Sequence, residues 1–220
     1  MATSKAAPSA LIDSAPLTDS LRALARAGEV RRYAKGTLLI QEGDHGDTLY
    51  LILAGQLRAY SSLDASEREV TYGVYGPGEY VGELGLDGGP RAANVMALQA
   101  SVCARIERAT LHAYIAQHPS FAFELLAKVI RRARAATLGL KQIALNDVYG
   151  RLKLLLESLA QVSADGSLHI TPALTHRDIA QRLGCGREMV SRVMKELERG
   201  GYLGSDGAAL VLRRALPPRW

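Results

Sequence analysis

The sequence has few cysteines and no long apolar run. Its 220 residues include two cysteines, Cys103 and Cys185, which lie far apart in the chain. Two thiols cannot form a disulfide framework, nor supply the four thiolates of an iron–sulfur or zinc site within one chain. Both cysteines are therefore expected to be small buried or incidental residues.

Signals for membrane insertion or export are also missing. No apolar run approaches the roughly 18 residues that span a bilayer. The start, Met1 to Pro16, is rich in Ala, Ser and Pro and lacks the apolar segment of a signal peptide. We therefore expect a cytoplasmic protein without a membrane partner, with residues 1–17 forming a flexible tail.

Patterns for catalysis are absent as well. Acid–base or nucleophilic chemistry could use Glu83, His112, His118 or Cys103. No paired carboxylates, metal-ligand spacing or nucleophile elbow accompanies them. The sequence therefore predicts neither an enzyme, a metal site nor a prosthetic group.

Charge is distributed unevenly along the chain, whose formal net charge is +5. Residues 1–119 hold 11 Lys and Arg against 13 Asp and Glu, whereas residues 171–220 hold 9 against 5. At 48% hydrophobic content the chain can bury a substantial core, and its length favours two small domains. The C-terminal part is therefore the expected site for an anionic partner such as double-stranded DNA.

The N-terminal region, residues 18–119, has the pattern of short strands. A helix is expected from Asp19 to Ala27, capped by Thr18 or Asp19 and closed by Gly28. After it come β-rich runs separated by glycine-rich turns: residues 37–41, 49–53, 56–60, 69–75 and 101–106. Such close spacing favours an antiparallel β-roll or jelly roll over βαβ units.

A heptad pattern marks residues 120–145. Apolar or small residues recur with alternating spacings of four and three at Ala122, Leu126, Val129, Ala133, Ala136, Leu140 and Ile143. This spacing predicts a helix that pairs with a second copy to form a homodimer. Alternatively the helix packs on its own barrel, for which Phe121, Phe123 and Leu125 are candidates.

Residues 146–220 have the order of a winged helix-turn-helix. Asp147 caps a helix to about Ala160 with Leu152, Leu155, Leu156 and Leu159 on one face, and Asp165-Gly166 is a turn. Thr175 and Asp178 form a capping box for a helix over 177–183, which Gly184 to Gly186 separates from a helix over 187–199. Tyr202-Leu203 and Ala208 to Leu212, joined across Ser205 to Gly207, predict a hairpin wing.

The helix over 187–199 is expected to have two faces. Its apolar residues are Met189, Val190, Val193, Met194 and Leu197, and its polar row is Arg187, Glu188, Ser191, Arg192 and Lys195. Arginine can bind guanine O6 and N7 with two hydrogen bonds, and glutamate can accept one from the cytosine amino group. Lysine and the helix N-terminus suit phosphates. This combination predicts DNA reading.

The stretch from Leu183 to Arg192 (LGCGREMVSR) resembles the recognition-helix signature of the bacterial catabolite activator and fumarate–nitrate regulator (CRP/FNR) family, and the resemblance runs from about Gly36 to Leu212. It implies that Arg187, Glu188 and Arg192 contact bases of a palindromic TGTGA-like site, and that Thr175 and His176 lie near phosphates. It also implies an α+β architecture: β-roll (18–119), dimerisation helix (120–145) and winged helix-turn-helix (146–220).

A second stretch, Gly78 to Leu86 (GEYVGELGL) followed by Pro90 to Ala93 (PRAA), is similar to the family's phosphate-binding cassette. The resemblance implies that Glu83 binds the ribose hydroxyl and Arg91 the cyclic phosphate. The implied ligand-binding set is Val81, Gly82, Glu83, Leu84, Arg91, Ala92, Ala93 and, at the dimer helix, Thr137. Glycines let backbone donors approach an anion, and an arginine fork matches its oxygens.

The segment from Glu83 to Arg91 is shorter than is common in the family, and only Thr137 of the pair Ala136–Thr137 could hydrogen-bond a base. The allosteric ligand is therefore open between cyclic AMP, the first expectation, another cyclic nucleotide such as cyclic GMP, cyclic di-GMP and none. Missing cysteines disfavour the oxygen-sensing branch.

The family implies RNA polymerase as a further partner, with residues 163–169 as one candidate contact. An alternative function is a cyclic-nucleotide-binding module that acts through contacts with other proteins. This alternative does not explain the polar row that begins at Arg187.

Overall fold

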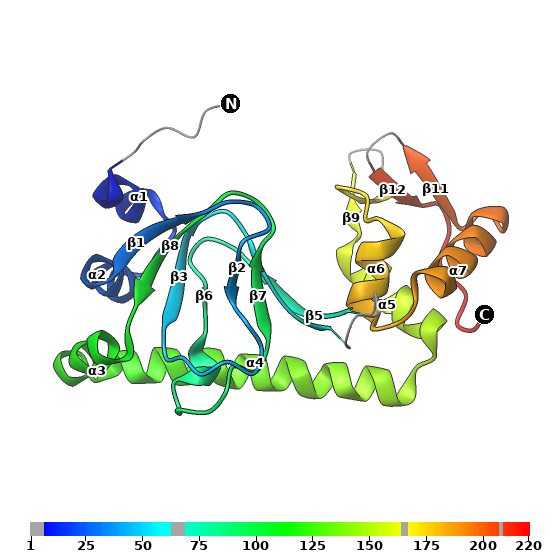
Figure 1. Cartoon of the computed structure of the whole chain (residues 1–220). Coiled ribbons are helices and arrows are strands. Elements are labelled where there is room, and N and C mark those ends of the chain that lie inside the picture. The colour runs from blue at the N-terminus through cyan, green and yellow to red at the C-terminus, as the bar shows by residue number, and fades with distance from the viewer. Residues whose placement is uncertain (1–6, 63–68, 164–166, 207–208) are drawn as a thin grey trace. The chain divides into compact units, whose positions relative to one another are not determined.

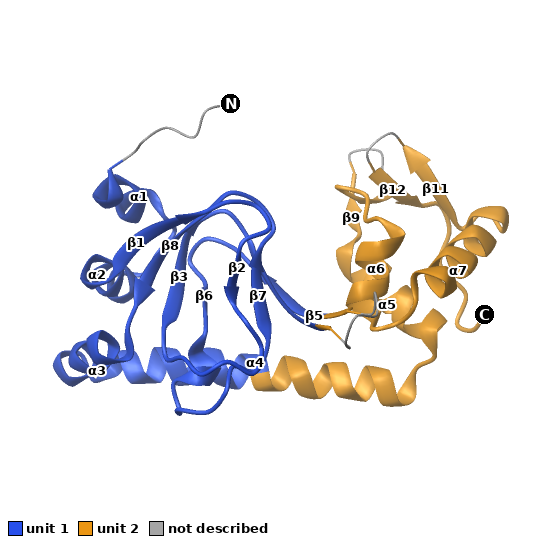
Figure 2. Cartoon of the chain, viewed as in Figure 1, with its two compact units in different colours: residues 1–61, 71–132 blue, residues 62–70, 133–220 orange. Residues whose placement is uncertain are grey.

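The computed structural model describes residues 7–62, 69–163, 167–206 and 209–220 (Figure 1). The chain forms two compact units, unit 1 with residues 1–61 and 71–132 and unit 2 with residues 62–70 and 133–220 (Figure 2). Helix α4, Ser120–Leu145, begins in unit 1 and ends in unit 2. In the described ranges no helix combines the length and apolarity needed to cross a bilayer.

Unit 1 contains two four-stranded sheets, ordered β1-β8-β3-β6 and β2-β7-β4-β5. Strand β8 pairs antiparallel with β1 and β3, and β7 pairs antiparallel with β2 and β4. The strands are β1 (Glu29–Tyr33), β2 (Leu38–Ile40), β3 (Leu49–Ala54), β4 (Leu57–Ser62), β5 (Glu69–Tyr75), β6 (Tyr80–Val81), β7 (Asn94–Ala97) and β8 (Ser101–Ile106). The predicted β-roll and all five predicted strands are confirmed, whereas β1, β6 and β7 were not predicted.

Strand β3 explains why the run from Leu49 is continuously apolar. Leu49, Leu51 and Leu53 belong to a core shared with the N-terminal helices, and Ile52 belongs to a second core shared with β2, β4 and β7. Because side chains alternate between the faces of a strand, β3 buries both of its faces. Its register with β8 places Leu51 opposite Ala104 and Ile52 opposite Cys103.

Two helices precede the barrel, α1 (Pro8–Ser14) and α2 (Asp19–Ala27). The Thr18 hydroxyl accepts a hydrogen bond from Leu21 N, and Gly28 follows the helix, as predicted. The flexible tail predicted for residues 1–17 is wrong for the part from residue 8 onward, since Ile12, Ala15 and Leu17 are buried in the core. Residues 1–6 lie outside the described residues.

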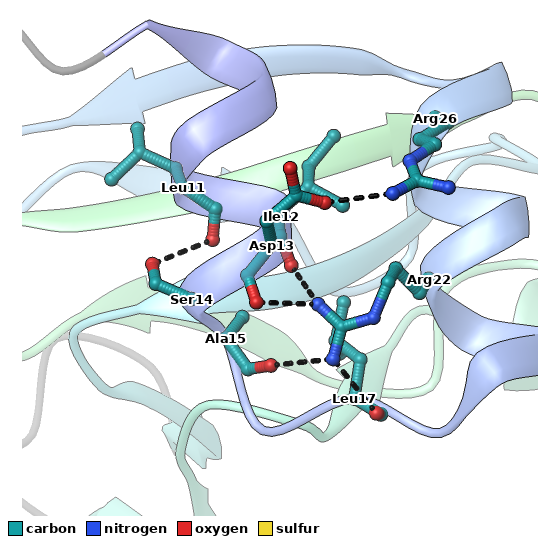
Figure 3. Close-up of polar contacts among 8 residues, drawn as sticks. All are labelled: Leu11, Ile12, Asp13, Ser14, Ala15, Leu17, Arg22 and Arg26. Carbon is teal, nitrogen blue, oxygen red and sulfur yellow. Dashed lines mark hydrogen bonds and ion pairs between the residues drawn. The ribbon is translucent and has the colours of Figure 1, made fainter.

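Arg22 of α2 holds the end of α1 in place. Its guanidinium donates to the carbonyl oxygens of Ile12, Asp13, Ala15 and Leu17, and Arg26 pairs with the Asp13 carboxylate at 2.7 Å (Figure 3). The carbonyls of Ile12 and Asp13 lie in the last turn of α1, so the arginine satisfies acceptors that the helix end leaves open. A polar side chain 10 residues downstream of Ile12 therefore fixes this segment, which apolar periodicity alone did not reveal.

Helix α3 (Arg108–Gln117) was not predicted, and α4 follows it. Phe121 of α4 is 1% exposed and packs in the barrel core, as the alternative interpretation allowed. Phe123, another candidate of that alternative, is 74% exposed and does not pack on the barrel. The large apolar residues that α4 leaves exposed are Phe123, Leu126, Ile130, Leu138, Leu140, Ile143 and Leu145.

In its described residues unit 2 contains the end of α4, the helices α5, α6 and α7, and a sheet of order β11-β12-β10-β9. Their bounds are α5 (Val148–Leu159), β9 (Gln161–Val162), β10 (Leu168–Ile170), α6 (His176–Leu183), α7 (Arg187–Arg199), β11 (Leu203–Asp206) and β12 (Ala209–Leu212). The predicted cap is confirmed, because the Asp147 carboxylate accepts from Gly150 N at 2.7 Å. Leu152, Leu156, Ile179, Val190 and Leu197 are fully buried and form its core.

The wing is larger than predicted, because β12 also pairs with β10 and so joins the hairpin to a second pair of strands. Ser205 and Asp206 belong to β11 rather than to a turn. Gly207 and Ala208, and the predicted turn at Asp165-Gly166, lie outside the described residues. The winged helix-turn-helix and the α+β class are confirmed.

Candidate functional site

The first candidate site is built on α6, the turn 184–186 and α7. The Thr175 hydroxyl accepts from Asp178 N at 3.1 Å, and the Asp178 carboxylate accepts from Thr175 N at 3.0 Å, so the predicted capping box is confirmed. Gly184 ends α6 with φ +65°, a left-handed conformation that glycine adopts without steric cost. Cys185 N donates to Ala180 O at 3.1 Å, which fixes the path into α7.

Helix α7 has the predicted apolar face. Val190 and Leu197 are fully buried, and Met194 and Val193 nearly so. Met189, expected on this face, is 36% exposed, and its sulfur lies 2.9 Å from Arg192 Nη2. The apolar face is therefore one residue narrower than predicted, because Met189 turns towards the polar side.

The polar row of α7 faces outward. Arg187, Glu188, Arg192 and Lys195 are exposed, and Ser191 is half-buried. Among the residues that the structure describes, no hydrogen bond or ion pair engages the side chains of Arg187, Glu188 or Lys195. An accessible row of two arginines, one lysine and one glutamate on a firmly packed helix can donate to guanine and phosphate and accept from cytosine.

The two predicted phosphate neighbours are engaged within the unit. The Thr175 hydroxyl also donates to the Asp178 carboxylate at 2.6 Å, so its proton is committed to the cap. The His176 imidazole lies 2.9 Å from the Ser191 hydroxyl, measured from Nδ1 to Oγ. His176 thus links the beginning of α6 to the polar row of α7.

The second candidate site is the cassette around Gly82, in unit 1. Gly82 has φ +96°, and a Cβ there would meet Thr48 O at 2.5 Å and Arg91 Nη1 at 3.1 Å. A Cβ on Gly85 would meet Gly46 O at 2.6 Å and Arg91 Nη1 at 2.9 Å. These glycines therefore make room for the neighbouring backbone and for Arg91, a different reason from the approach to an anion that the sequence suggested.

Arg91 is 7% exposed and bonds to the barrel itself. Its Nη1 donates to Gly82 O at 2.8 Å and its Nη2 to Thr48 O at 3.0 Å. Burial lowers the pKa of the guanidinium, and the nearby Tyr50, Asp47 and Glu83 oppose that shift. The guanidinium therefore fixes the cassette to the strand that begins beside Thr48.

Glu83 meets a residue that the sequence did not single out. Its side chain is 5% exposed and forms an ion pair with Arg132 of α4. Arg132 also donates to Tyr80 O, and its guanidinium carbon lies 4.5 Å from the centre of the Tyr75 ring. One turn earlier, Lys128 pairs with Glu79 at 3.2 Å. Two cations four residues apart on α4 thus face the two glutamates of the cassette, which are also four residues apart.

Two buried donors beside Glu83 lack partners. Arg132 Nε and the Tyr80 hydroxyl make no hydrogen bond with any described residue. Burial raises the pKa of Tyr80 to about 12, so its hydroxyl keeps its proton. Buried donors without acceptors are rare in folded proteins, so each of these two requires a physical explanation.

The remaining predicted ligand residues lie in varied surroundings. Val81 is buried, Ala93 is half-buried, and Leu84 and Ala92 are exposed. Thr137 is exposed, and its hydroxyl donates to Ala133 O within α4 at 3.0 Å. In the described ranges no cluster of three His, Cys, Asp or Glu residues could hold a metal ion.

Comparisons with known proteins match both units. Residues 30–118 match the model of the cyclic nucleotide-binding domain, and residues 150–215 match the Crp-like helix-turn-helix domain. The cAMP-activated global transcriptional regulator CRP of Escherichia coli O6:H1 is 30% identical over 188 residues, which cover 83% of this chain and 89% of that protein. The cyclic AMP receptor protein of Thermus thermophilus is 31% identical over 192 residues and 84% of each chain.

Among solved structures, the c-di-GMP responsive global regulator CLP of Xanthomonas campestris has a TM-score of 0.77. It is 25% identical in sequence, and the match covers 88% of this chain and 97% of that one. These relatives thus include a cAMP-activated regulator, a cyclic AMP receptor protein and a c-di-GMP responsive regulator.

Proposed function

Because the chain belongs to the CRP/FNR family of transcription regulators, we propose that it acts as a homodimer that reads a palindromic TGTGA-like DNA site and is gated by a cyclic nucleotide, with cyclic AMP as the first candidate. Arg187, Glu188, Ser191 and Arg192 contact bases. Lys195, Thr175 and His176 lie at phosphates. The observation that carries the proposal is the mostly exposed row from Arg187 to Lys195, on a helix whose opposite face is buried.

Dimer formation uses α4. Leu126, Leu140 and Ile143 of the predicted heptad seam are 53%, 68% and 58% exposed. An exposed apolar row of this length on one helix is typical of an interaction surface. Two copies of α4 packed along the seam bury it, and half-sites about one helical turn apart follow for such a dimer, a spacing taken from the catabolite activator as the general example.

Ligand gating uses the cassette. Glu83 supplies an acceptor for ribose hydroxyls, and Arg91 and Arg132 supply positive charge for the cyclic phosphate. Arg132 is paired with Glu83, so a ribose hydroxyl that bonds to Glu83 competes with a residue of the dimer helix. The donors on Arg132 Nε and Tyr80 gain an acceptor from a polar ligand. Ligand binding thereby changes what holds α4 to the barrel, and Thr137 on the same helix adds a contact to the base.

The effector experiment is calorimetric titration of the purified full chain with cyclic AMP, cyclic GMP and cyclic di-GMP, followed by DNA binding with and without each ligand. The binding probe is a fluorescent duplex with two TGTGA half-sites, and the control is the same duplex with both half-sites scrambled. We expect one ligand to release heat and to tighten binding to the first duplex only. By reciprocity, that duplex then tightens ligand binding by the same factor.

Different results identify different parts of the proposal. Heat from cyclic di-GMP alone replaces cyclic AMP as the effector. If the protein binds the TGTGA duplex selectively but no nucleotide releases heat, the proposed gating is wrong and the proposed DNA reading stands. Equal affinity for both duplexes at low and moderate salt overturns the TGTGA-like site.

A further inference from the structure

His176 and Ser191 form a contact between the two helices of the DNA-reading motif. His176 is the first residue of α6, and Ser191 lies on the polar row of α7 between Glu188 and Arg192. His176 Nδ1 lies 2.9 Å from Ser191 Oγ, and both residues are half-buried. The hydroxyl on the recognition helix is therefore oriented by a side chain from a different helix.

The direction of this hydrogen bond decides what Ser191 offers to DNA. A neutral imidazole carries one N–H and one acceptor nitrogen, and a hydroxyl carries one proton and two lone pairs. If the ring proton is on Nε2, Nδ1 accepts the proton of Ser191, and the serine oxygen presents only lone pairs. If the proton is on Nδ1, the ring donates, and Ser191 keeps its own proton for another partner.

A DNA phosphate selects between these two forms. His176 lies at the beginning of α6, where the positive end of the helix dipole favours an anion. A phosphate oxygen accepts hydrogen bonds and cannot donate one, so its contact with the ring requires the proton on Nε2. In a neutral ring Nδ1 is then the acceptor, and Ser191 donates to it.

We propose that His176 is a positioning residue that makes Ser191 an acceptor towards the major groove, so that Ser191 selects a base with an exocyclic amino group, adenine or cytosine. This rests on the proposed function, because it needs α7 in the groove and His176 near a phosphate. The consequence is that the contact of His176 with one DNA phosphate determines which bases Ser191 prefers at one position. Bases that present only acceptors at that position, guanine and thymine, lose the hydrogen bond.

The experiment is selection of bound duplexes from a pool with randomised half-sites, using the full chain. Wild type is compared with Ser191→Ala, His176→Phe and His169→Phe. The last is a matched control, because His169 contacts Ser167 at 2.6 Å in the same unit but lies on β10. Thermal unfolding of each variant reports folding separately.

We expect Ser191→Ala and His176→Phe to flatten the preference for adenine or cytosine at the same base position, by about 3- to 10-fold, the size of one hydrogen bond. The base preference of the double variant should be no weaker than that of either single variant, since both substitutions remove the same interaction. His169→Phe should keep the full preference. Lower affinity for all sequences alike, without a change at that position, assigns His176 a purely structural role and overturns the proposal.

A test on the unmodified protein avoids any folding defect. Replacing the preferred base by purine, for adenine, or by 2-pyrimidinone, for cytosine, removes only the amino group. Wild type should lose about 3- to 10-fold in affinity for that duplex, and Ser191→Ala should be indifferent to it. A wild-type protein that reads its site but ignores the missing amino group contradicts this inference alone. A wild-type protein without any sequence preference contradicts the proposed function instead.

Discussion

The cassette of unit 1 and the recognition helix of unit 2 treat their charged residues in opposite ways. Glu83 and Arg91 are buried and engaged, the first by Arg132 and the second by two backbone carbonyls. Arg187 and Lys195 are exposed, on a helix whose other face is fully buried. The cassette holds its charged side chains in internal contacts, whereas the recognition helix exposes its charged side chains to solvent.

This difference shows what each region needs for its task. A surface that meets a large anion benefits from charges that need not break other contacts first. A cassette that gates a helix needs contacts that a ligand can exchange, because a ligand shifts an equilibrium only by interacting differently with its two states. Changes to the buried charges should therefore have larger effects than changes to the exposed ones.

Removing Arg132 should produce the largest effect. Arg132→Ala leaves the carboxylate of Glu83 buried without its cation, and breaking a buried pair in this way costs about 3–5 kcal/mol of stability. The stability of unit 1 is measured by urea-induced unfolding, monitored by circular dichroism. Glu83→Gln combined with Arg132→Met should regain most of the loss, because no uncompensated charge remains. Equal destabilisation by the single and double variants would show that packing, not charge, holds this contact.

Arg187→Ala should affect recognition rather than folding. Its side chain is exposed and makes no described contact, so the unfolding midpoint should stay unchanged. Discrimination at one base pair should fall by about 1–3 kcal/mol, the value of a bidentate contact to guanine. Competition gel shifts with single-base variants of the site measure this. Arg199→Ala, an exposed arginine at the end of the same helix, is the matched control. An unchanged site preference with Arg187→Ala removes this residue from base reading.

Alkaline pH should weaken unit 1 through Cys103. Burial raises the pKa of this thiol from 9.0 to about 12, so the folded state retains a proton that the unfolded state releases. Stability is therefore full below pH 9 and is lost as the pH rises towards 12, by about 1 kcal/mol between pH 9 and pH 10. Unfolding of wild type and of Cys103→Ala at both pH values isolates this contribution. Cys185→Ala should reduce the loss less, since Arg151 opposes the shift there. If the stability of wild type and of Cys103→Ala fell equally with rising pH, the buried thiol would be ruled out as the cause.

Much of the fold could be predicted because local signals and packing agree. The caps at Thr18, Asp147 and Thr175, the β3 run and the two faces of α7 follow from residue types at fixed spacings. Strands β6 and β9 are two residues long, too short for any periodicity, and β7 interrupts a glycine-rich loop. The end of helix α1 is held by Arg22 of the next helix, a polar contact across 9 and 10 residues that the apolar pattern does not encode.

The candidate site divides in the same way. The exposure of Arg187 and Arg192 follows from the period of α7, so the sequence could predict it. Arg132 could not be assigned to Glu83, because the partner lies 49 residues away on another element. The contact between His176 and Ser191 joins two helices whose crossing depends on the whole domain, so only the structure could reveal it.

Lys195→Ala sharpens the contrast between buried and exposed charge because its effect should be small and should depend on salt. The ammonium group is exposed, so its removal should leave the unfolding midpoint unchanged. A lysine at a phosphate releases about one counterion, so the slope of log affinity against log salt should become shallower by about 0.9 in each subunit. Fluorescence anisotropy between 50 and 200 mM salt measures that slope, and the loss of affinity should be equal for the TGTGA duplex and for its scrambled control. A loss confined to the TGTGA duplex would place Lys195 at a base edge instead, beside the residues that read sequence.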